Sequence, residues 1–421
     1  MSMKKSFLLA MMAIFALAIH ATNAIPLLKK AEKVFVDGIH YQLDAKNQKA
    51  KVIAGNNLYT GDIVIPEKFE NDSIVYYVEE IAADAFKDCS TLSSVSIPTT
   101  VTKIGSGAFE KCTALTAISI PSSVREIASG TFFECSSLKD VELHDGIKDI
   151  GHGAFKRCTA LEEIVIPASV KSIDYNTFLG CSSLKNVSLP KSLEKIGYSA
   201  FQDCASLEEI TIPGAVKAIG WVAFKNCTSL RSFAFTTSMD NIANSIFEGC
   251  TSLVNVTIPN SIKSIAHDAF KGCASLDSLK LPNSIKDIGS SAFEDCSNLR
   301  IINLPSIKEI PSKLFRNCSS LADIRLPLSI KEIGSDAFYG CSSLTRIEIP
   351  VSVKEIGGGA FDHCNSLETV IMKAGTPAKI KKDSFSKRFQ KEGTLVVPNI
   401  VSYQSDPKSN WAKFRNISLI P

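Results

Sequence analysis

Thirteen cysteines recur at a nearly fixed interval, and this period constrains the fold more than any other feature of the chain. Eleven of the twelve intervals between successive cysteines are 23 residues, and one, between Cys296 and Cys318, is 22. A phenylalanine stands three residues before every cysteine and a leucine three residues after it, as Phe293 and Leu299 flank Cys296. Such a period indicates a solenoid, in which each unit buries its apolar face only by stacking on its neighbours.

Within one unit, the apolar residues predict two short extended segments. The first, Leu-Glu-Glu-Ile-Val-Ile at 161–166, has strand-like spacing and ends at Pro167, which cannot donate a ladder hydrogen bond. A second extended segment follows at 170–173, and the Ala-Phe-x-x-Cys stretch is too short for more than a helical turn. We therefore predict a β-rich right-handed coil of thirteen units with short helical turns, its parallel strands stacked about 4.8 Å apart.

The consensus I-G-x-x-A-F-x-x-C-x-x-L-x-x-I-x-I-P, as at 333–350, resembles the bacterial surface-antigen (BspA-like) leucine-rich repeat. The resemblance implies a leucine-rich-repeat solenoid over 81–372, an N-terminal cap at 25–80 and a C-terminal cap at 373–421. Caps are expected physically, because the end units would otherwise expose apolar faces and unpaired strand edges. The cap-like residues lie at 38–41 and 61–66, and at Val397, Pro398, Tyr403, Trp411, Phe414 and Ile417.

The same resemblance implies a secreted or cell-surface protein that adheres to host proteins or to other cells. Its partners would be proteins of the host matrix or of microbial surfaces, and a glycan is the alternative ligand. Two rival functions stay open: a non-catalytic structural protein of the envelope, and a carbohydrate-binding protein. We expect a monomer.

The first 24 residues have the pattern of a secretory signal peptide. Lys4 and Lys5 form a basic start, an uncharged apolar run covers 7–19, and small residues end at Ala24, after which we predict cleavage. An anchor would need roughly 20 apolar residues, and this run has 13 before His20. The prediction is a secreted or cell-surface chain without a transmembrane segment once cleaved, and a periplasmic location is also compatible.

Charge gives no case for nucleic-acid binding. The 46 Lys and Arg residues nearly balance the 43 Asp and Glu residues, and loss of Lys4 and Lys5 would leave a net charge of +1. We predict no nucleic-acid partner.

The regular spacing of the cysteines favours a role in packing of the core over disulfide formation, metal binding or catalysis. An odd number forbids complete internal disulfide pairing, and a strict column between Phe and Leu suits buried thiols, although stacked units could bring neighbouring cysteines within disulfide range. No paired cysteine spacing of the zinc-finger type occurs, and equivalence of the thirteen positions argues against one nucleophile. The repeat-region histidines are scattered without a triad spacing, at His144, His152, His267 and His363. We predict no enzyme activity, no metal and no cofactor.

One variable position carries a run of rings. The residue after Ile-Gly is small in the outer units but becomes His152, Tyr175, Tyr198 and Trp221 in four consecutive units, with His267 two units further. At the strand spacing, the four form a strip about 15 Å long. These five residues are the candidate ligand-binding residues, because exposed rings suit protein hot spots and sugar faces. The alternative is that the rings stack from unit to unit and only stabilise the coil.

Overall fold

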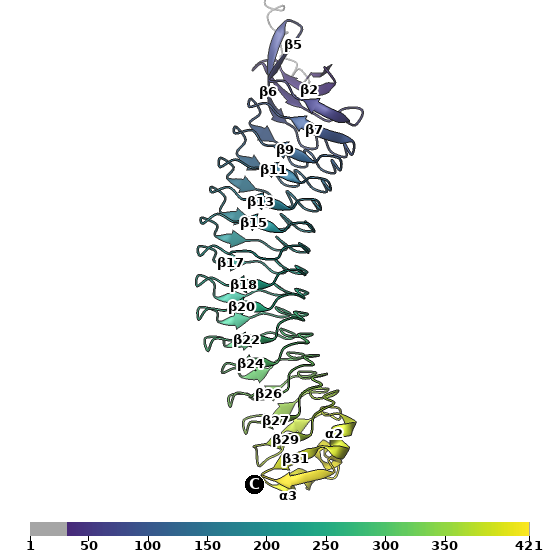
Figure 1. The fold of residues 1–421 in the computed structure, drawn as a ribbon, viewed down its shortest axis with the longest axis vertical. Helices are drawn as coiled ribbons and strands as arrows, with labels where there is room; N and C mark the ends of the chain where they lie inside the picture. Colours follow the sequence, from purple (N-terminus) through teal and green to yellow (C-terminus); the bar gives the residue numbers. More distant parts are fainter. Residues whose placement is uncertain (1–31, 421) are drawn as a thin grey trace, which may run out of the picture.

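The computed structural model describes residues 32–420, so the signal peptide predicted for residues 1–24 lies outside the described residues. The chain forms a β-solenoid of about 15 turns of ~23 residues with almost no helix. The turns stack along one long axis (Figure 1). The predicted leucine-rich-repeat solenoid is therefore confirmed. Most turns place one short strand in a first column and another in a second column, whereas residues 207–213 and 321–326 keep their place in the coil without forming a first-column strand.

The first column holds the strands that begin just after the repeat leucine. Its parallel pairs keep equivalent residues side by side, such as Ile164 with Val187. The strands are β7 (Leu92–Ser96), β9 (Ala117–Ser119), β11 (Asp140–Glu142), β13 (Glu163–Val165), β15 (Asn186–Ser188), β18 (Ser232–Ala234), β20 (Asn255–Thr257), β22 (Ser278–Lys280), β24 (Ile301–Asn303), β27 (Arg346–Ile349) and β29 (Thr369–Met372).

The second column consists of two-residue strands that place a buried isoleucine in each unit. Ile173 pairs with Ile196 in the same parallel register. The strands are β8 (Lys103–Ile104), β10 (Glu126–Ile127), β12 (Asp149–Ile150), β14 (Ser172–Ile173), β16 (Lys195–Ile196), β17 (Ala218–Ile219), β19 (Asn241–Ile242), β21 (Ser264–Ile265), β23 (Asp287–Ile288), β25 (Glu309–Ile310), β26 (Glu332–Ile333), β28 (Glu355–Ile356) and β30 (Lys379–Ile380).

The Ala-Phe-x-x-Cys stretches form turns that do not continue into helices. In one unit, the Cys112 N–H donates to the Phe109 carbonyl (3.1 Å), while the Phe109 N–H donates across to Thr131 of the next unit (2.9 Å). Left-handed residues on either side, Gly107 at φ 64° and Lys111 at φ 59°, prevent helical propagation. Alternate N–H groups therefore bond between units, and this part of the coil is a third ladder.

A mixed sheet precedes the repeats. It comprises β1 (Lys33–Val36), β2 (Ile39–Asp44), β3 (Lys49–Val52), β5 (Lys68–Asn71) and β6 (Ile74–Ile81), with β3 parallel to β6. Strand β6 also pairs with β8, so the sheet continues into the second column. Strand β4 (Gly61–Val64) pairs with β7 and continues into the first column. The N-terminal strands thus extend both strand columns of the coil, the second through β6 and the first through β4.

Aromatic residues close the other end. The segments there are α2 (Lys387–Glu392), β31 (Thr394–Val397), α3 (Ile400–Gln404), the 3₁₀ turn η1 (Asn410–Lys413) and β32 (Asn416–Leu419). Strands β31 and β32 extend the first column beyond β29. The Trp411 indole N–H donates to the Ala378 carbonyl (2.7 Å) and the Tyr403 hydroxyl to Ala374 (2.9 Å), which satisfies both polar groups inside the core.

The core is a stack of phenylalanines beside a stack of thiols. Phe178 and Phe201 are fully buried, with ring centroids 5.4 Å apart and planes 9° from parallel. All thirteen cysteines are buried free thiols. The Cys204 thiol donates to the Phe178 carbonyl of the preceding unit (Sγ to O, 3.2 Å), an arrangement that recurs through the stack. Burial raises the pKa of these thiols, to about 12 for Cys135, so they act as packed side chains.

Candidate binding surface

Three neighbouring units present large aromatic side chains to solvent. Tyr175, Tyr198 and Trp221 are 51%, 51% and 59% exposed and follow the second-column strands β14, β16 and β17. We call these three residues the ring patch. Aromatic side chains of this size are usually mostly buried, so a run of three exposed rings is the candidate contact surface of the described residues.

The two histidines of the strip are instead tied to the backbone. The His152 Nδ1 lies 3.0 Å from the Tyr175 carbonyl oxygen, to which it donates. The Ser290 N–H donates to Nδ1 of His267 (3.0 Å), which therefore accepts. The two imidazoles thus hold opposite tautomers, each used between units. Asn244, whose side chain accepts from the His267 N–H (3.1 Å), separates His267 from the ring patch.

Stacking between units does not account for the ring patch. Within residues 32–420, the strip contains one ring contact, between His152 and Tyr175, whose centroids are 4.3 Å apart at 49°. The structure records no ring contact between Tyr175 and Tyr198 or between Tyr198 and Trp221 in that range. Their exposed faces are therefore free for a partner.

The backbone beneath the ring patch is rigid. The Tyr198 carbonyl accepts from the Asn176 N–H (2.9 Å) and the Trp221 carbonyl from the Ser199 N–H (3.1 Å). Gly220 lies against the preceding unit, where a Cβ would come within 2.4 Å of the Tyr198 nitrogen. Close approach of this kind requires glycine. The rings are therefore mounted on tightly packed, hydrogen-bonded turns.

Strain accompanies the ring patch at Val222. Its φ is 50°, in the left-handed region that a β-branched residue rarely adopts. Equivalent positions in neighbouring units are Asn176, Ser199 and Ser245, at φ 59°, 52° and 49°. Strained residues cluster at binding sites, where the surrounding structure enforces them. Val222 is the one β-branched residue in a column that otherwise holds glycine, serine, aspartate, asparagine and one lysine, Lys313, and this contrast was the signal in the sequence.

Relief of this strain is expected to stabilise the protein. Val222→Asn should raise the free energy of unfolding by about 1 kcal/mol, because asparagine tolerates the left-handed region. The reciprocal variant, Asn176→Val, should lower it by a similar amount. Urea unfolding of both variants measures the effect, and a loss of stability in Val222→Asn would contradict the assignment of strain.

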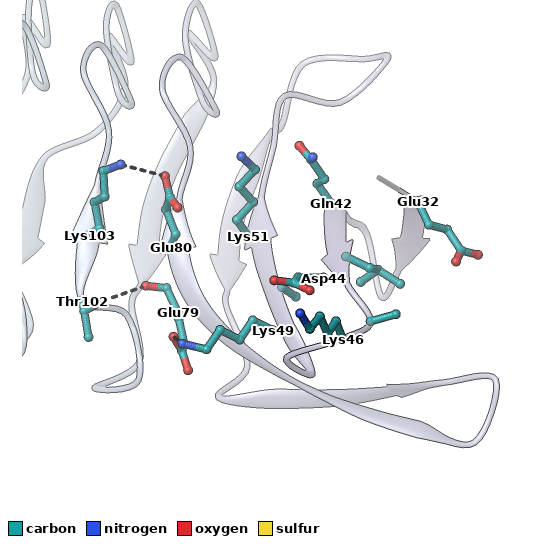
Figure 2. Close-up of a pocket in the computed structure, with 13 residues that line it drawn as sticks. Glu32, Gln42, Asp44, Lys46, Lys49, Lys51, Glu79, Glu80, Thr102 and Lys103 are labelled. Carbon is teal, nitrogen blue, oxygen red and sulfur yellow. Dashed lines mark hydrogen bonds and ion pairs between the residues drawn. The ribbon is translucent and has the colours of Figure 1, made fainter. Parts of the chain in front are cut away.

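A cavity of about 920 Å³ lies at the N-terminal sheet, away from the rings. Its lining residues come from β2, β3, β6, β8 and the adjoining turns (Figure 2). Lys49 pairs with Glu79 (2.6 Å) and Lys103 with Glu80 (3.3 Å). Its lining contains four lysines and four acidic residues, so the cavity has no charge preference.

The described residues offer no centre for metal chemistry. Between residues 32 and 420, no group of three or more His, Cys, Asp or Glu side chains lies close enough to hold a metal ion. Over the same range, no helix has the length and apolar character needed to cross a membrane.

The two strand columns, the leucine positions and the buried Phe and Cys stacks define a leucine-rich-repeat protein. Six copies of the BspA type leucine rich repeat region match residues 67–185, 148–276 and 263–392. The chain belongs to this family. A comparison with curated proteins gave no match.

Solved structures of the same architecture come from several bacteria. A leucine-rich repeat protein from Bacteroides ovatus is 30% identical over 83% of this chain and 99% of that one, with a TM-score of 0.73. A leucine rich cell surface protein from Faecalibacterium prausnitzii is 32% identical over 81% and 94%, with a TM-score of 0.59. The pneumococcal vaccine antigen PcpA shares the fold at 22% identity over 93% and 99%, with a TM-score of 0.53.

Proposed function

We propose that this chain is a secreted or cell-surface, non-catalytic adhesion protein that binds a protein partner through the ring patch. The observation that carries the proposal is the exposure of Tyr175, Tyr198 and Trp221 on rigid turns without contacts among themselves. Tyrosine and tryptophan are enriched at interface hot spots, since each buries a large area at small entropic cost. The hydrogen-bonded turns that carry the rings reduce the entropic cost of binding further.

A surface location is supported by relatives and by the sequence. The Faecalibacterium prausnitzii protein is a cell surface protein, and it is 32% identical to this chain. The signal-peptide pattern at 1–24 agrees with export. The ligand would be a protein of the host matrix or of a microbial surface.

Two rival functions predict different binding. A carbohydrate-binding protein would use the same rings against sugar faces and give a defined pattern on a glycan array. A structural envelope protein would bind neither glycans nor matrix proteins. Screening the chain without residues 1–24 against immobilised extracellular-matrix proteins and a glycan array distinguishes all three.

The ring patch can be tested without disturbing the coil. Tyr175→Ser, Tyr198→Ser and Trp221→Ser together should weaken binding to the matrix protein found in the screen by at least about a hundredfold. Serine occupies the equivalent position in five units, namely Ser106, Ser129, Ser290, Ser312 and Ser335, so the fold should persist.

A matched control removes exposed apolar side chains elsewhere. Val165→Ser and Val351→Ser, at residues 67% and 59% exposed, should leave affinity unchanged. Surface plasmon resonance gives the affinities and circular dichroism the fold. Full affinity in the triple variant would refute the ring patch as the binding site, and unfolding would show that its rings stabilise the coil.

A further inference from the structure

The C-terminal segment 373–420 is strongly basic, whereas the rest of the described chain is acidic. It holds ten Lys and Arg residues against three Asp and Glu, while residues 32–372 hold 32 against 40. All ten basic residues of the segment are exposed. The segment forms one end of the solenoid, where α2 and α3 lie (Figure 1). Positive charge is therefore concentrated at one end of an otherwise acidic molecule, and this end attracts anions.

Four of these basic residues surround Gln390 of α2. The Gln390 side-chain nitrogen lies 3.5 Å from the Lys382 carbonyl oxygen. The Gln390 carbonyl accepts from the Arg415 N–H (3.0 Å). Lys391 follows Gln390 directly, and Lys387 lies about one helical turn before it. We call Lys382, Lys387, Lys391 and Arg415 the basic cluster.

Within residues 32–420, no member of the basic cluster forms an ion pair. The two nearest acidic residues have other contacts. Glu392, at the end of α2, pairs with Arg388 (3.1 Å). The Asp383 carboxylate lies against Gly358 of the preceding unit. The four positive charges are therefore available to a partner.

The cations of α2 are placed where they disfavour the helix. Lys387 and Lys391 are four residues apart, and like charges at this spacing repel each other on a helix surface. The first turn of α2 contains no acidic residue, although acidic side chains are the favoured ones there. Helix stability therefore does not explain why these positions are basic, and binding of an anion does.

The surroundings of the basic cluster suit a polymer better than a membrane. Helices that lie on membranes insert exposed apolar side chains beside their cations. In α2, Phe389 is instead 2% exposed and packs against Phe385 and Phe414, with ring centroids 5.7 and 5.9 Å away. The four cations lie on three segments, before α2, on α2 and before β32. A flexible chain that carries closely spaced charges can contact all of them.

We propose that the basic cluster binds an acidic polysaccharide, a polymer with carboxylate or sulfate groups along its chain. The lysine ammonium groups attract these groups as point charges, and Arg415 binds one of them through paired hydrogen bonds. Release of counterions from the polymer favours association and makes it dependent on salt. The proposal does not depend on the ring patch.

Fluorescein-labelled heparin tests the basic cluster directly. In fluorescence anisotropy, the chain without residues 1–24 should bind heparin, and neutral dextran should not compete. The affinity should fall as the salt concentration rises. Lys387→Ala, Lys391→Ala and Arg415→Ala together should weaken heparin binding at least about tenfold.

A matched control removes two lysines and one arginine from the repeats. Arg125, Lys148 and Lys171 are exposed, lie in three consecutive units and form no ion pair over residues 32–420. Acidic residues directly follow the first two, at Glu126 and Asp149, so the local charge is balanced. Replacement of all three by alanine should leave heparin affinity unchanged. An equal loss of affinity in both triple variants would overturn the proposal, because net charge alone would then explain binding.

A second variant separates binding from folding. Lys387→Glu places an acid four residues before Lys391 and in the first turn of α2, and both effects stabilise the helix. The variant should therefore keep or raise the melting temperature while it weakens heparin binding at least about threefold. Unchanged heparin affinity in this folded variant would also overturn the proposal.

Three further results bear on the site. Failure of the wild-type protein to bind heparin would overturn the proposal. Binding to phosphatidylglycerol vesicles that excess heparin does not displace would assign the basic cluster to a membrane surface, and that result would overturn it as well. Normal heparin binding by the triple ring-patch variant would show that the two sites are independent, whether or not the ring patch binds a matrix protein.

Discussion

Raising the pH from about 8 to about 10 is expected to unfold the protein cooperatively. Burial raises the pKa of the core thiols, to about 12 for Cys181 and Cys296, whereas an unfolded thiol titrates near 8.5. A group whose folded pKa is raised stabilises the folded state below its unfolded pKa, and this stability is lost as pH rises. One pH unit above the unfolded value, each thiol removes about 1.4 kcal/mol.

The number of thiols makes this effect large. Thirteen thiols are buried and free, and together they would remove ~18 kcal/mol at that pH, against the 5–15 kcal/mol of a typical domain. Below about pH 10, tyrosines contribute little, because their unfolded pKa is near 10. The free energy of unfolding should therefore fall as the pH rises, with a slope that corresponds to the release of several protons per molecule on unfolding.

Urea unfolding at a series of pH values measures that slope. Cys204→Ala should reduce the slope by about one proton, because it removes one titrating thiol from the unfolded chain. In the folded protein at pH 8, iodoacetamide should leave the thiols unmodified. An intact circular dichroism spectrum at pH 11, or thiols that react readily in the folded state, would contradict a buried thiol column.

The sequence predicted the architecture because the repeat reports the core directly. Every phenylalanine three residues before a cysteine is fully buried. The helical turns were a less accurate prediction, since left-handed conformations at Lys111, Glu134 and Arg157 follow from bonds between units, such as Lys111 N–H to the Phe133 carbonyl (2.7 Å). These residue types have no preference for that conformation, so composition could not indicate it.

The candidate site was predictable in position more than in detail. The repeat position that follows Ile-Gly located Tyr175, Tyr198 and Trp221, because the position of a residue in the repeat determines whether its side chain is exposed. The bonds that tie His152 and His267 to the backbone depend on side-chain rotamers, which the pattern does not specify. The absence of first-column strands at 207–213 and 321–326 was not visible in the sequence, because both segments keep the Leu-x-x-Ile-x-apolar-Pro pattern of the other units.

Deletion of one complete period is expected to leave a folded, shorter protein. Removing Cys135–Arg157 takes out β11 and β12 and spares the ring patch. Phe132 should then stack on Phe178, and Cys158 should take the place of Cys135 in the thiol column. Because stability in a solenoid sums over units and their interfaces, the melting temperature should fall by only a few degrees.

The deletion of 135–157 also removes a buried polar group that destabilises the folded protein. The deleted period contains His144, whose Nε2 is buried without a hydrogen-bond partner in the described structure, so its loss should offset part of the missing interface.

Deletion of Cys135–Gly146 instead removes twelve residues and joins half a unit to a complete one. The Phe, Cys and Leu columns then lose their alignment, which exposes apolar faces that no neighbour can cover. This variant should lose its single cooperative transition and bind the dye ANS, whereas the period deletion should do neither. Thermal melting followed by circular dichroism compares the two deletions. If both melt as sharply as the full chain, the units are not coupled through aligned columns, and the stacking of Phe132, Phe155 and Phe178 does not determine the fold.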